Sequence, residues 1–285
     1  MGIRLKGLNL CYMGVDKELL VFPHPNYVLS VQRREASKVW YRCPAISYII
    51  EHPEGRILWE TGISTRWADE WLPEWLFLVD CNEITPEVCL EARLKAVGLG
   101  PEDFKYVIQG HLHTDHAGGL RLFEKAGAEI LVHEDEHKHV SGLIAPLDRP
   151  TEFFYNRVDW EFVFVRKPTL VYGDQEILKD VWLVSLPGHT PGTMGLLVRL
   201  ERTGWVLLTT DAMYLHDTYG PPPVGTPITW DVPKWTQSIE KIRRLATKYE
   251  AFIFPGHDET GIKQYRDGRS EPKTIECFRP DYWYE

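Results

Sequence analysis

The chain has 285 residues, of which 44% are hydrophobic and 26% are charged, and its net charge is −9. A chain of this length and composition can bury a sizeable core, so it is a globular protein. Its acidic surface repels phosphate backbones, which argues against a nucleic-acid partner.

The cysteines and the first residues indicate the compartment. The five cysteines are odd in number and include no Cys-x-x-Cys pair, which suits reduced thiols better than disulfides. The first residues lack the apolar run of a signal peptide, and no stretch approaches the roughly 20 apolar residues that span a bilayer. We therefore expect a cytoplasmic protein that makes no membrane contact.

Two segments predict similar β-hairpins. In residues 45–62 and again in residues 194–212, two apolar runs flank a turn, HPEG in the first segment and ERTG in the second. Each hairpin ends in an acidic residue at the mouth of a loop, Glu60 and Asp211 respectively. The repetition predicts a single domain over residues 1–285, built from two related halves that each contribute a sheet.

Helices are expected at three places along the chain. The first has Thr85 as its N-cap and Gly98 at its end. A second begins after Gly119, with Phe123 on its apolar face, and a third follows Pro233, where apolar residues recur at helical spacing. Short strands are predicted at residues 105–110, 128–133, 181–186 and 251–256.

The hexapeptide HLHTDH, residues 111–116, holds four potential metal ligands directly after a predicted strand. On an extended chain His111 and His113 fall on the same side, and Asp115 and His116 can reach a neighbouring position. Imidazole nitrogen and carboxylate oxygen without a thiolate suit Zn, Mn, Fe or Co. Four such side chains in six positions would be unusual for an ordinary surface loop.

One hexapeptide cannot complete two coordination spheres, so further ligands must come from other strand ends. His189 and His257 follow predicted strands, and Asp211 ends the second hairpin. Each of these three residues alone is more often a turn or cap residue. Together with the hexapeptide they predict a site for two metal ions, assembled from distant parts of the sequence.

The motifs HLHTDHAGG, PGHTPGTMG, TTDA and PGHD, in this order, resemble those of the metallo-β-lactamase superfamily over about residues 45 to 260. The resemblance implies an αββα sandwich of two mixed β-sheets flanked by helices. It also implies two divalent metal ions with a hydroxide between them. Zinc is the expected metal, with iron, cobalt or manganese as alternatives. The implied ligands are His111, His113 and His189 for one ion, Asp115, His116 and His257 for the other, and Asp211 as the bridge.

Tyr214 stands three residues after Asp211, where its phenol either points at the metals or packs against Trp230 or Tyr219. The DAxY arrangement resembles the N-acyl homoserine lactonases of this superfamily. So do the EHPEGRILWETG hairpin and the tail, which includes Gln264-Tyr265-Arg266. These relatives are quorum-quenching hydrolases, so the resemblance implies a small-molecule lactone substrate with an apolar acyl chain.

The resemblance also implies roles for individual residues. The hydroxide would attack the lactone carbonyl, Tyr214 would stabilise the oxyanion, and Asp115 would pass a proton to the departing alkoxide. One departure from the family pattern is Glu60, where an aspartate is usual. Glutamate is one methylene longer, so its contact with the site is expected to shift while the metal ligands stay untouched.

An acyl chain needs an apolar groove, and two segments rich in aromatic residues are available. Their side chains could line the groove, form a homodimer contact or pack in the core. Trp71 and Trp75 lie four apart, as on a helix face, which favours the core or an interface. The candidates are Trp67, Trp71, Trp75, Leu76, Phe77, Phe153, Phe154, Tyr155 and Trp160.

The remaining histidines are interpreted as solvated surface residues. His133, His137 and His139 lie among the acidic residues of a HEDEHKH segment that is metal-like in composition but outside the motifs. The same interpretation applies to His24, His52 and His216.

Other functions share parts of this pattern. A lactonase for another ring, of the γ-butyrolactone or pyridoxolactone type, has the same ligands and stays open. A glyoxalase-II-like thioesterase resembles THxHxDHxGG with a further histidine after the second motif, where this chain has Gly110 and Thr193. A flavodiiron-type redox enzyme would place a glutamate at position 113, and a non-catalytic binding module would have lost ligands that are all intact here.

Overall fold

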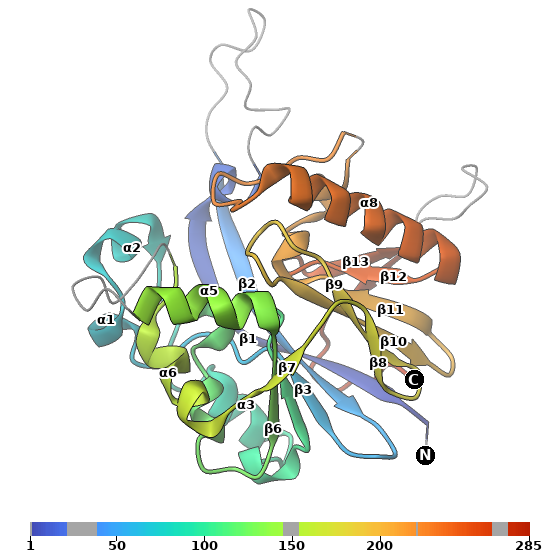
Figure 1. Ribbon diagram of the computed structural model, residues 1–285, viewed down its shortest axis with the longest axis horizontal. Helices are drawn as coiled ribbons and strands as arrows, with labels where there is room; N and C mark the ends of the chain where they lie inside the picture. The colour runs from blue at the N-terminus through green and yellow to red at the C-terminus, as the bar shows by residue number, and fades with distance from the viewer. Residues whose placement is uncertain (1, 22–38, 145–153, 221, 264–272) are drawn as a thin grey trace, which may run out of the picture.

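The computed structural model describes residues 2–21, 39–144, 154–220, 222–263 and 273–285. Two seven-stranded sheets are formed within these residues (Figure 1). None of the described helices combines the length and the apolar character needed to cross a membrane. Five residues named above lie outside the described part of the chain: His24, Phe153, Gln264, Tyr265 and Arg266.

The first sheet comes from the N-terminal part of the chain. Its strands are β1 (Arg4–Asp16), β2 (Trp40–Glu51), β3 (Ile57–Trp59), β4 (Val79–Asp80), β5 (Tyr106–Ile108), β6 (Glu129–His133) and β7 (Thr169–Val171). They are arranged in the order β4-β1-β2-β3-β5-β6-β7. The pairs from β4 to β3 are antiparallel and those from β3 to β7 are parallel. The first predicted hairpin is confirmed as β2–β3, with Ile50 opposite Ile57.

The second sheet comes from the C-terminal part. Its strands are β8 (Gln175–Leu178), β9 (Val181–Ser185), β10 (Met194–Leu200), β11 (Gly204–Leu208), β12 (Phe252–Phe254), β13 (Thr260–Lys263) and β14 (Lys273–Glu276). Their order is β14-β13-β12-β11-β10-β9-β8. Among the described strands of this second sheet, only the β11–β12 pair is parallel. The second predicted hairpin is confirmed as β10–β11, with Leu196 opposite Leu208.

Helices lie on the outer sides of both sheets (Figure 1). The helices of the described residues are α1 (Trp67–Glu70), α2 (Pro73–Leu78), α3 (Leu90–Ala96), α4 (Thr114–Ala117), α5 (Glu134–Ile144), α6 (Arg157–Arg166), α7 (His216–Tyr219) and α8 (Val232–Tyr249); α4 begins within the hexapeptide. Short 3-10 turns occur at Lys17–Leu19, Pro101–Asp103, Leu120–Phe123 and Thr210–Ala212.

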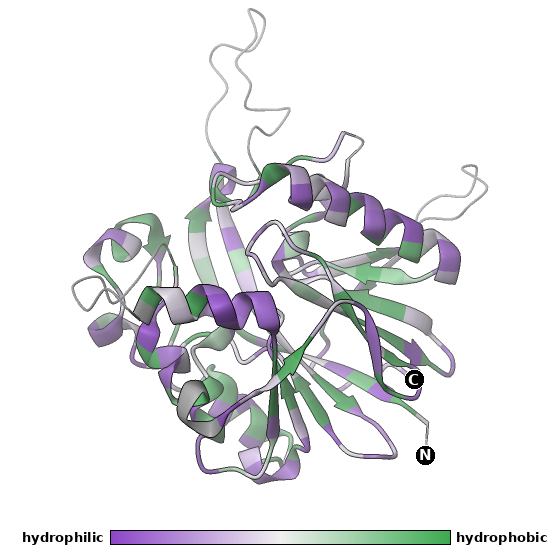
Figure 2. Cartoon of the chain, in the orientation of Figure 1, coloured by the Kyte–Doolittle hydropathy of each residue, from purple (hydrophilic) through white to green (hydrophobic). Residues whose placement is uncertain are grey.

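Apolar side chains hold these layers together. Trp59 of the first sheet and Leu196 and Phe254 of the second belong to one buried cluster between the sheets. Helix α8 buries Ile239 and Ile242 against the outer face of the second sheet, while α3 and α6 pack with the first sheet in another cluster. Figure 2 shows the strands mostly hydrophobic and much of α8 hydrophilic. The predicted αββα sandwich is confirmed.

Two predicted helices differ from those observed. The helix expected from Thr85 begins only at Leu90. A separate turn, in which Val88 N donates to Thr85 O, precedes it, and the extended Cys89 (ψ 171°) separates this turn from the helix. The helix ends at Ala96, and Gly98 stops it as predicted, with a φ of +74° after the Val97 cap. The helix expected after Gly119 is a single 3-10 turn, Leu120–Phe123.

The prediction that Trp71 and Trp75 share a helix face is also wrong. Helix α1 ends at Glu70 and α2 begins at Pro73, so Trp71 lies in the link between the two helices and Trp75 lies in α2. A residue before a proline is restricted to extended conformations, and Leu72 has φ −68° and ψ 144°. Both tryptophans are buried all the same, with ring centroids 6.0 Å apart.

Candidate metal centre

The four ligand-type residues of the hexapeptide lie in the loop that leaves β5 and in the α4 turn that follows. His111, His113 and His116 are buried. The rings of His111 and His113 have centroids 4.7 Å apart, as expected for alternate residues of an extended chain. Met194 N of the second sheet donates to Gly110 O at 2.8 Å. The loop therefore lies where the two sheets meet.

The first ligand cluster consists of His111, His113, His189 and Asp211, whose ligand atoms all lie within 4.8 Å of one another. His189 Nε2 lies 2.9 Å from His113 Nδ1 and 3.3 Å from His111 Nε2. Asp211 Oδ2 lies 3.4 Å from His189 Nε2. Loops from both sheets therefore contribute to this cluster.

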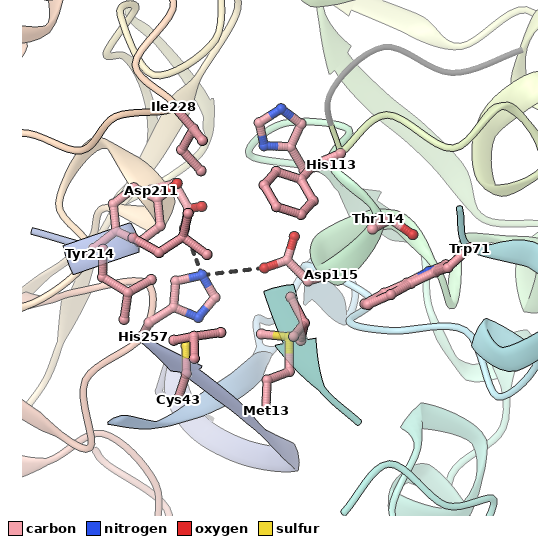
Figure 3. A pocket seen from close by; sticks show the side chains of 15 residues that line it. Met13, Cys43, Trp71, His113, Thr114, Asp115, Asp211, Tyr214, Ile228 and His257 are labelled. Atoms are coloured by element: carbon pink, nitrogen blue, oxygen red, sulfur yellow. Dashed lines mark ion pairs between the residues drawn. The ribbon is translucent and has the colours of Figure 1, made fainter. Parts of the chain in front are cut away.

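The second ligand cluster consists of Asp115, His116, His257 and the same Asp211. His257 Nε2 lies 3.4 Å from Asp115 Oδ2 and 3.2 Å from Asp211 Oδ1 (Figure 3). His116 Nε2 lies at 3.4 Å and 3.2 Å from the same two oxygens. Asp211 directs Oδ1 at the second cluster and Oδ2 at the first, so a single carboxylate lies between the two.

These donor atoms fit divalent cations better than they fit one another. A neutral imidazole offers one N–H, so the three facing histidine nitrogens of the first cluster cannot satisfy each other by hydrogen bonds. Asp211 Oδ1 and His116 Nε2 are buried and make no hydrogen bond to any described residue, which is unfavourable without a compensating charge. The two clusters, which share Asp211, are consistent with a dinuclear metal site.

The electrostatics of the two clusters agree with this interpretation. Burial lowers the pKa of His113 to about 4 and that of His189 to about 3, so both rings are neutral near pH 7 and present lone pairs. Burial opposes the charged form of His116 too, but the Asp211 and Asp115 carboxylates outweigh it and raise its pKa. The carboxylates of the second cluster therefore favour positive charge beside them.

Two further contacts orient the second cluster. His257 Nδ1 lies 2.9 Å from Pro44 O, which leaves Nε2 directed at Asp211. Glu60 Oε2 lies 3.3 Å from His116 Nδ1, and Glu60 Oε1 accepts from Gly110 N at 3.1 Å. The glutamate that replaces the usual aspartate thus contacts both a ligand-type histidine and the backbone of the hexapeptide loop.

The Tyr214 phenol lies against the first cluster. Its oxygen is 3.2 Å from His189 Nδ1, and its ring stacks on His257 with centroids 5.4 Å apart. Of the two predicted orientations, the structure has the phenol beside the ligand-type histidines. Trp230, the alternative packing partner, is 50% exposed. Burial, followed by the Asp211 and Asp115 carboxylates, raises the pKa of Tyr214, so the phenol keeps its proton.

A pocket with about 450 Å³ of empty space opens onto both clusters. His113, Asp115, Asp211, Tyr214 and His257 line its polar end (Figure 3). The other walls are mostly apolar: Met13, Val15, Leu19, Leu20, Trp71, Val79, Phe154 and Ile228. A second pocket, with about 440 Å³ of empty space, shares His113 and Ile228 with the first and is also lined by His139, Tyr155 and Trp230.

The motifs and the sandwich point to one family. The model of the metallo-beta-lactamase superfamily matches residues 40–257. The chain belongs to the metallo-beta-lactamase superfamily. The match covers the hexapeptide, His189, Asp211 and His257.

Individual relatives are similar over most of the chain. An N-acyl homoserine lactonase, AiiB, from Agrobacterium fabrum is 28% identical over 271 residues, which cover 90% of this chain and 94% of that protein. An N-acyl homoserine lactonase from Bacillus sp is 31% identical over 246 residues, covering 81% and 87% respectively.

One solved structure is similar as well. It is an N-acyl homoserine lactone hydrolase with the product N-hexanoyl-L-homoserine bound at its catalytic metal centre. The two structures superpose with a TM-score of 0.72 at 26% sequence identity, covering 90% of this chain and 94% of that chain.

The aromatic residues that were candidates for an acyl groove divide between pocket, core and surface. Trp71 and Phe154 line the pocket. Trp75 and Trp160 are buried in the core, where the Trp75 ring lies 5.7 Å from that of Phe154. Phe77 is 88% exposed. Periodicity could not separate these roles, because α1 and α2 are too short to present one continuous face.

The prediction that the HEDEHKH segment is solvated surface is wrong for two of its residues. His133 and Glu136 are buried, because β6 ends and α5 begins beneath the loops that carry the ligand clusters. Glu136 accepts hydrogen bonds from both of these loops and was missed. Its spacing of four from Val140, which is also buried, is the sequence signal that could have indicated a buried helix face.

Proposed function

We propose that this protein is a metal-dependent lactonase that opens the homoserine lactone ring of N-acyl homoserine lactones, and so acts in quorum quenching. The observation that carries the proposal is the Tyr214 phenol directed at the shared ligand site, at the polar end of an apolar pocket. The activity of the similar lactonases supports it. The proposed partner is a small molecule and not a nucleic acid.

We assign the two metal ions to the two ligand clusters. His111, His113 and His189 would hold one ion, and Asp115, His116 and His257 the other, with Asp211 shared by both. Zinc is the proposed metal, since the donor set is nitrogen and carboxylate oxygen; iron, cobalt and manganese share this preference. Two such cations would act as Lewis acids and would lower the pKa of a water molecule to about 7.

Two residues carry the proton and charge chemistry. The Tyr214 phenol is a donor at neutral pH, since the ordinary pKa of tyrosine is about 10, and from its position it can donate to a lactone oxygen as negative charge develops there. Asp115 reaches the same pocket, where its carboxylate would take up the proton released by the newly formed carboxyl group and pass it to the alkoxide that leaves when the ring opens. The product is the N-acyl homoserine carboxylate.

The apolar wall of the pocket suits the other part of the substrate. A lactone ring at the polar end leaves the acyl chain among Met13, Val15 and Trp71. Each methylene that leaves water there contributes roughly 0.8 kcal/mol to binding. An apolar wall of this kind favours an acyl substrate over a bare lactone ring.

Two alternatives use the same ligands. Hydrolysis of another lactone, of the γ-butyrolactone or pyridoxolactone type, needs the clusters and Tyr214 but leaves the apolar wall without a role. A glyoxalase-II-like thioesterase needs the clusters alone. The combination of phenol and apolar wall favours the acyl homoserine lactone.

A substrate panel tests the proposal. With zinc-loaded full-length protein, kcat/KM is measured for N-hexanoyl and N-decanoyl homoserine lactone, γ-butyrolactone, a thioester and a β-lactam. We expect the acyl homoserine lactones to be the best substrates. Asp211→Asn serves as the control for spontaneous ring opening. A thioester preferred by a large factor over every lactone overturns the proposal while leaving the fold intact.

A further inference from the structure

Glu136 is a buried carboxylate outside both ligand clusters, in the first turn of α5. Its Oε1 accepts hydrogen bonds from Leu112 N at 2.9 Å and from the Tyr155 hydroxyl at 2.8 Å. Its Oε2 accepts from the Thr190 hydroxyl at 2.7 Å and from Gly192 N at 3.1 Å. Four donors fill the lone pairs of a carboxylate.

Three of these donors adjoin the histidines of the first cluster. Leu112 lies between the two histidines that open the hexapeptide. The Tyr155 ring packs edge-on against His113, with centroids 4.5 Å apart. Thr190 directly follows His189. A single carboxylate therefore touches the immediate neighbour of every histidine in the first cluster.

The first turn of α5 is also in close contact with the loop that follows His189. A Cβ on Gly192 would lie 2.3 Å from Glu136 N and 2.4 Å from Glu136 Cβ, so the loop of residues 189–192 packs directly on the first turn of α5. The second cluster is supported by other groups, the carbonyl of Pro44 and the carboxylate of Glu60. The hydrogen bonds of Glu136 thus serve one cluster and not the other.

We propose that Glu136 is a positioning residue that holds residues 111–113 and 189–192 at the separation required by the metal ion of the first cluster. This inference rests on the proposed function only in that the first cluster binds a metal ion. It adds a role that the ligand set does not contain, because Glu136 belongs to neither ligand cluster.

The hydrogen-bond pattern makes a Glu136→Gln variant informative. Each carboxylate oxygen accepts from one hydroxyl and one backbone N–H. A hydroxyl can turn and accept from an amide nitrogen, but a backbone N–H cannot. Whichever oxygen the amide nitrogen replaces, either Leu112 N or Gly192 N loses its acceptor, and the loop that carries it is released.

The test is metal binding by the full-length chain after the metal has been removed. Co²⁺ is titrated in with a competing chelator, and stoichiometry and absorption spectrum are recorded. In Glu136→Gln we expect one ion bound as in the wild type and one weakened about 10- to 100-fold, the usual effect of removing a partner of metal ligands. The weakened ion should be the one with the histidine-rich spectrum.

The matched control is Glu134→Gln, in the same turn of α5. Glu134 is partly exposed and pairs with Lys138 at 2.5 Å, so its variant should bind both ions with wild-type affinity. Wild-type affinity for both ions in Glu136→Gln overturns the inference, as does equal weakening of both, which would indicate a general loss of structure.

A second variant covers the case in which Glu136→Gln does not fold. Tyr155→Phe keeps the ring against His113 but removes one of the four hydrogen bonds, and should weaken the first ion about 2- to 5-fold. Unchanged affinity there also overturns the inference. A chain that binds both ions but opens no lactone contradicts the proposed function and leaves the role of Glu136 standing.

Discussion

The proposed lactone chemistry depends on the Tyr214 hydroxyl, although this group is not among the metal ligands. Its ring is held by stacking on His257, and its oxygen lies beside His189. The ring position therefore does not depend on the hydroxyl. This separates the chemical role of the residue from its packing role.

Tyr214→Phe should lower kcat for an acyl homoserine lactone on the order of 100-fold, the effect of removing one donor to a developing oxyanion. Metal content should stay as in the wild type. Tyr12→Phe is the control, because the Tyr12 hydroxyl donates to Glu259 at 2.6 Å and does not line the pocket. Undiminished kcat/KM in Tyr214→Phe removes the residue from the mechanism.

Asp159 is a buried carboxylate whose charge is costly. Burial raises its pKa to about 7, although the Thr114 hydroxyl donates to it at 2.8 Å and Arg121 lies 4.0 Å away. The ordinary aspartate pKa is about 3.9, so the folded protein binds this proton more tightly than the unfolded chain does. The stability gained from that proton is present below about pH 4 and is lost as the pH rises to about 7.

Asp159→Asn removes this titration. As the pH rises from 4 to 8, we expect the free energy of unfolding of the variant to increase relative to that of the wild type by roughly 1 to 4 kcal/mol. Urea denaturation of both chains in the presence of a chelator, at several pH values, measures the difference. Parallel pH profiles for the two chains would show that the charge of Asp159 is not costly in the folded state.

At the scale of elements, the start of α8 is tied to the loop of His189. The Asp231 side chain accepts from Lys234 N at 3.0 Å and caps the helix, while Asp231 N donates to Gly188 O at 2.9 Å. The cap therefore fixes the helix and the ligand-bearing loop together.

Asp231→Ala should destabilise the fold by about 1 kcal/mol, the usual effect of losing an N-cap. Asp231→Asn keeps the capping oxygen and should lose only a few tenths of that amount. Urea denaturation measures both. If alanine and asparagine at this position give equal stability, the side-chain cap contributes nothing.

At the scale of the whole molecule, the ligand site joins the two sheets. Asp115 and the three histidines of the hexapeptide come from the first sheet, while His189, Asp211 and His257 come from loops of the second. Ions bound there would link the halves of the sandwich, and such binding stabilises only the folded state.

Removal of metal by a chelator should lower the Tm on the order of 10 °C, since a ligand at 1,000 times its Kd adds about 4 kcal/mol. Added Zn²⁺ should restore the Tm, and Mg²⁺, which prefers oxygen ligands, should not. Differential scanning calorimetry with metal analysis on the same samples measures this. A Tm that stays constant after the metal is gone would show that the ions do not link the sheets.

Local patterns were sufficient for much of this protein. The two hairpins, helix α8 and the strand ends before His111, His189 and His257 follow from alternation, turn residues and helical spacing, which act over a few residues. The order of the four motifs was enough for the family and hence the sandwich. Even the end of α3 was readable, because Gly98 takes a positive φ that most residues avoid.

What the tertiary structure decided depends on contacts between distant segments. Asp211 turns one oxygen to each cluster because loops from two sheets meet there. Trp71, in the link before α2, lines the pocket, while Trp75, within α2, packs only in the core. Glu136 was expected in water and is buried under two loops. Burial is set by what the rest of the chain lays over a residue; spacing along the sequence can indicate a helix face, but not what covers it.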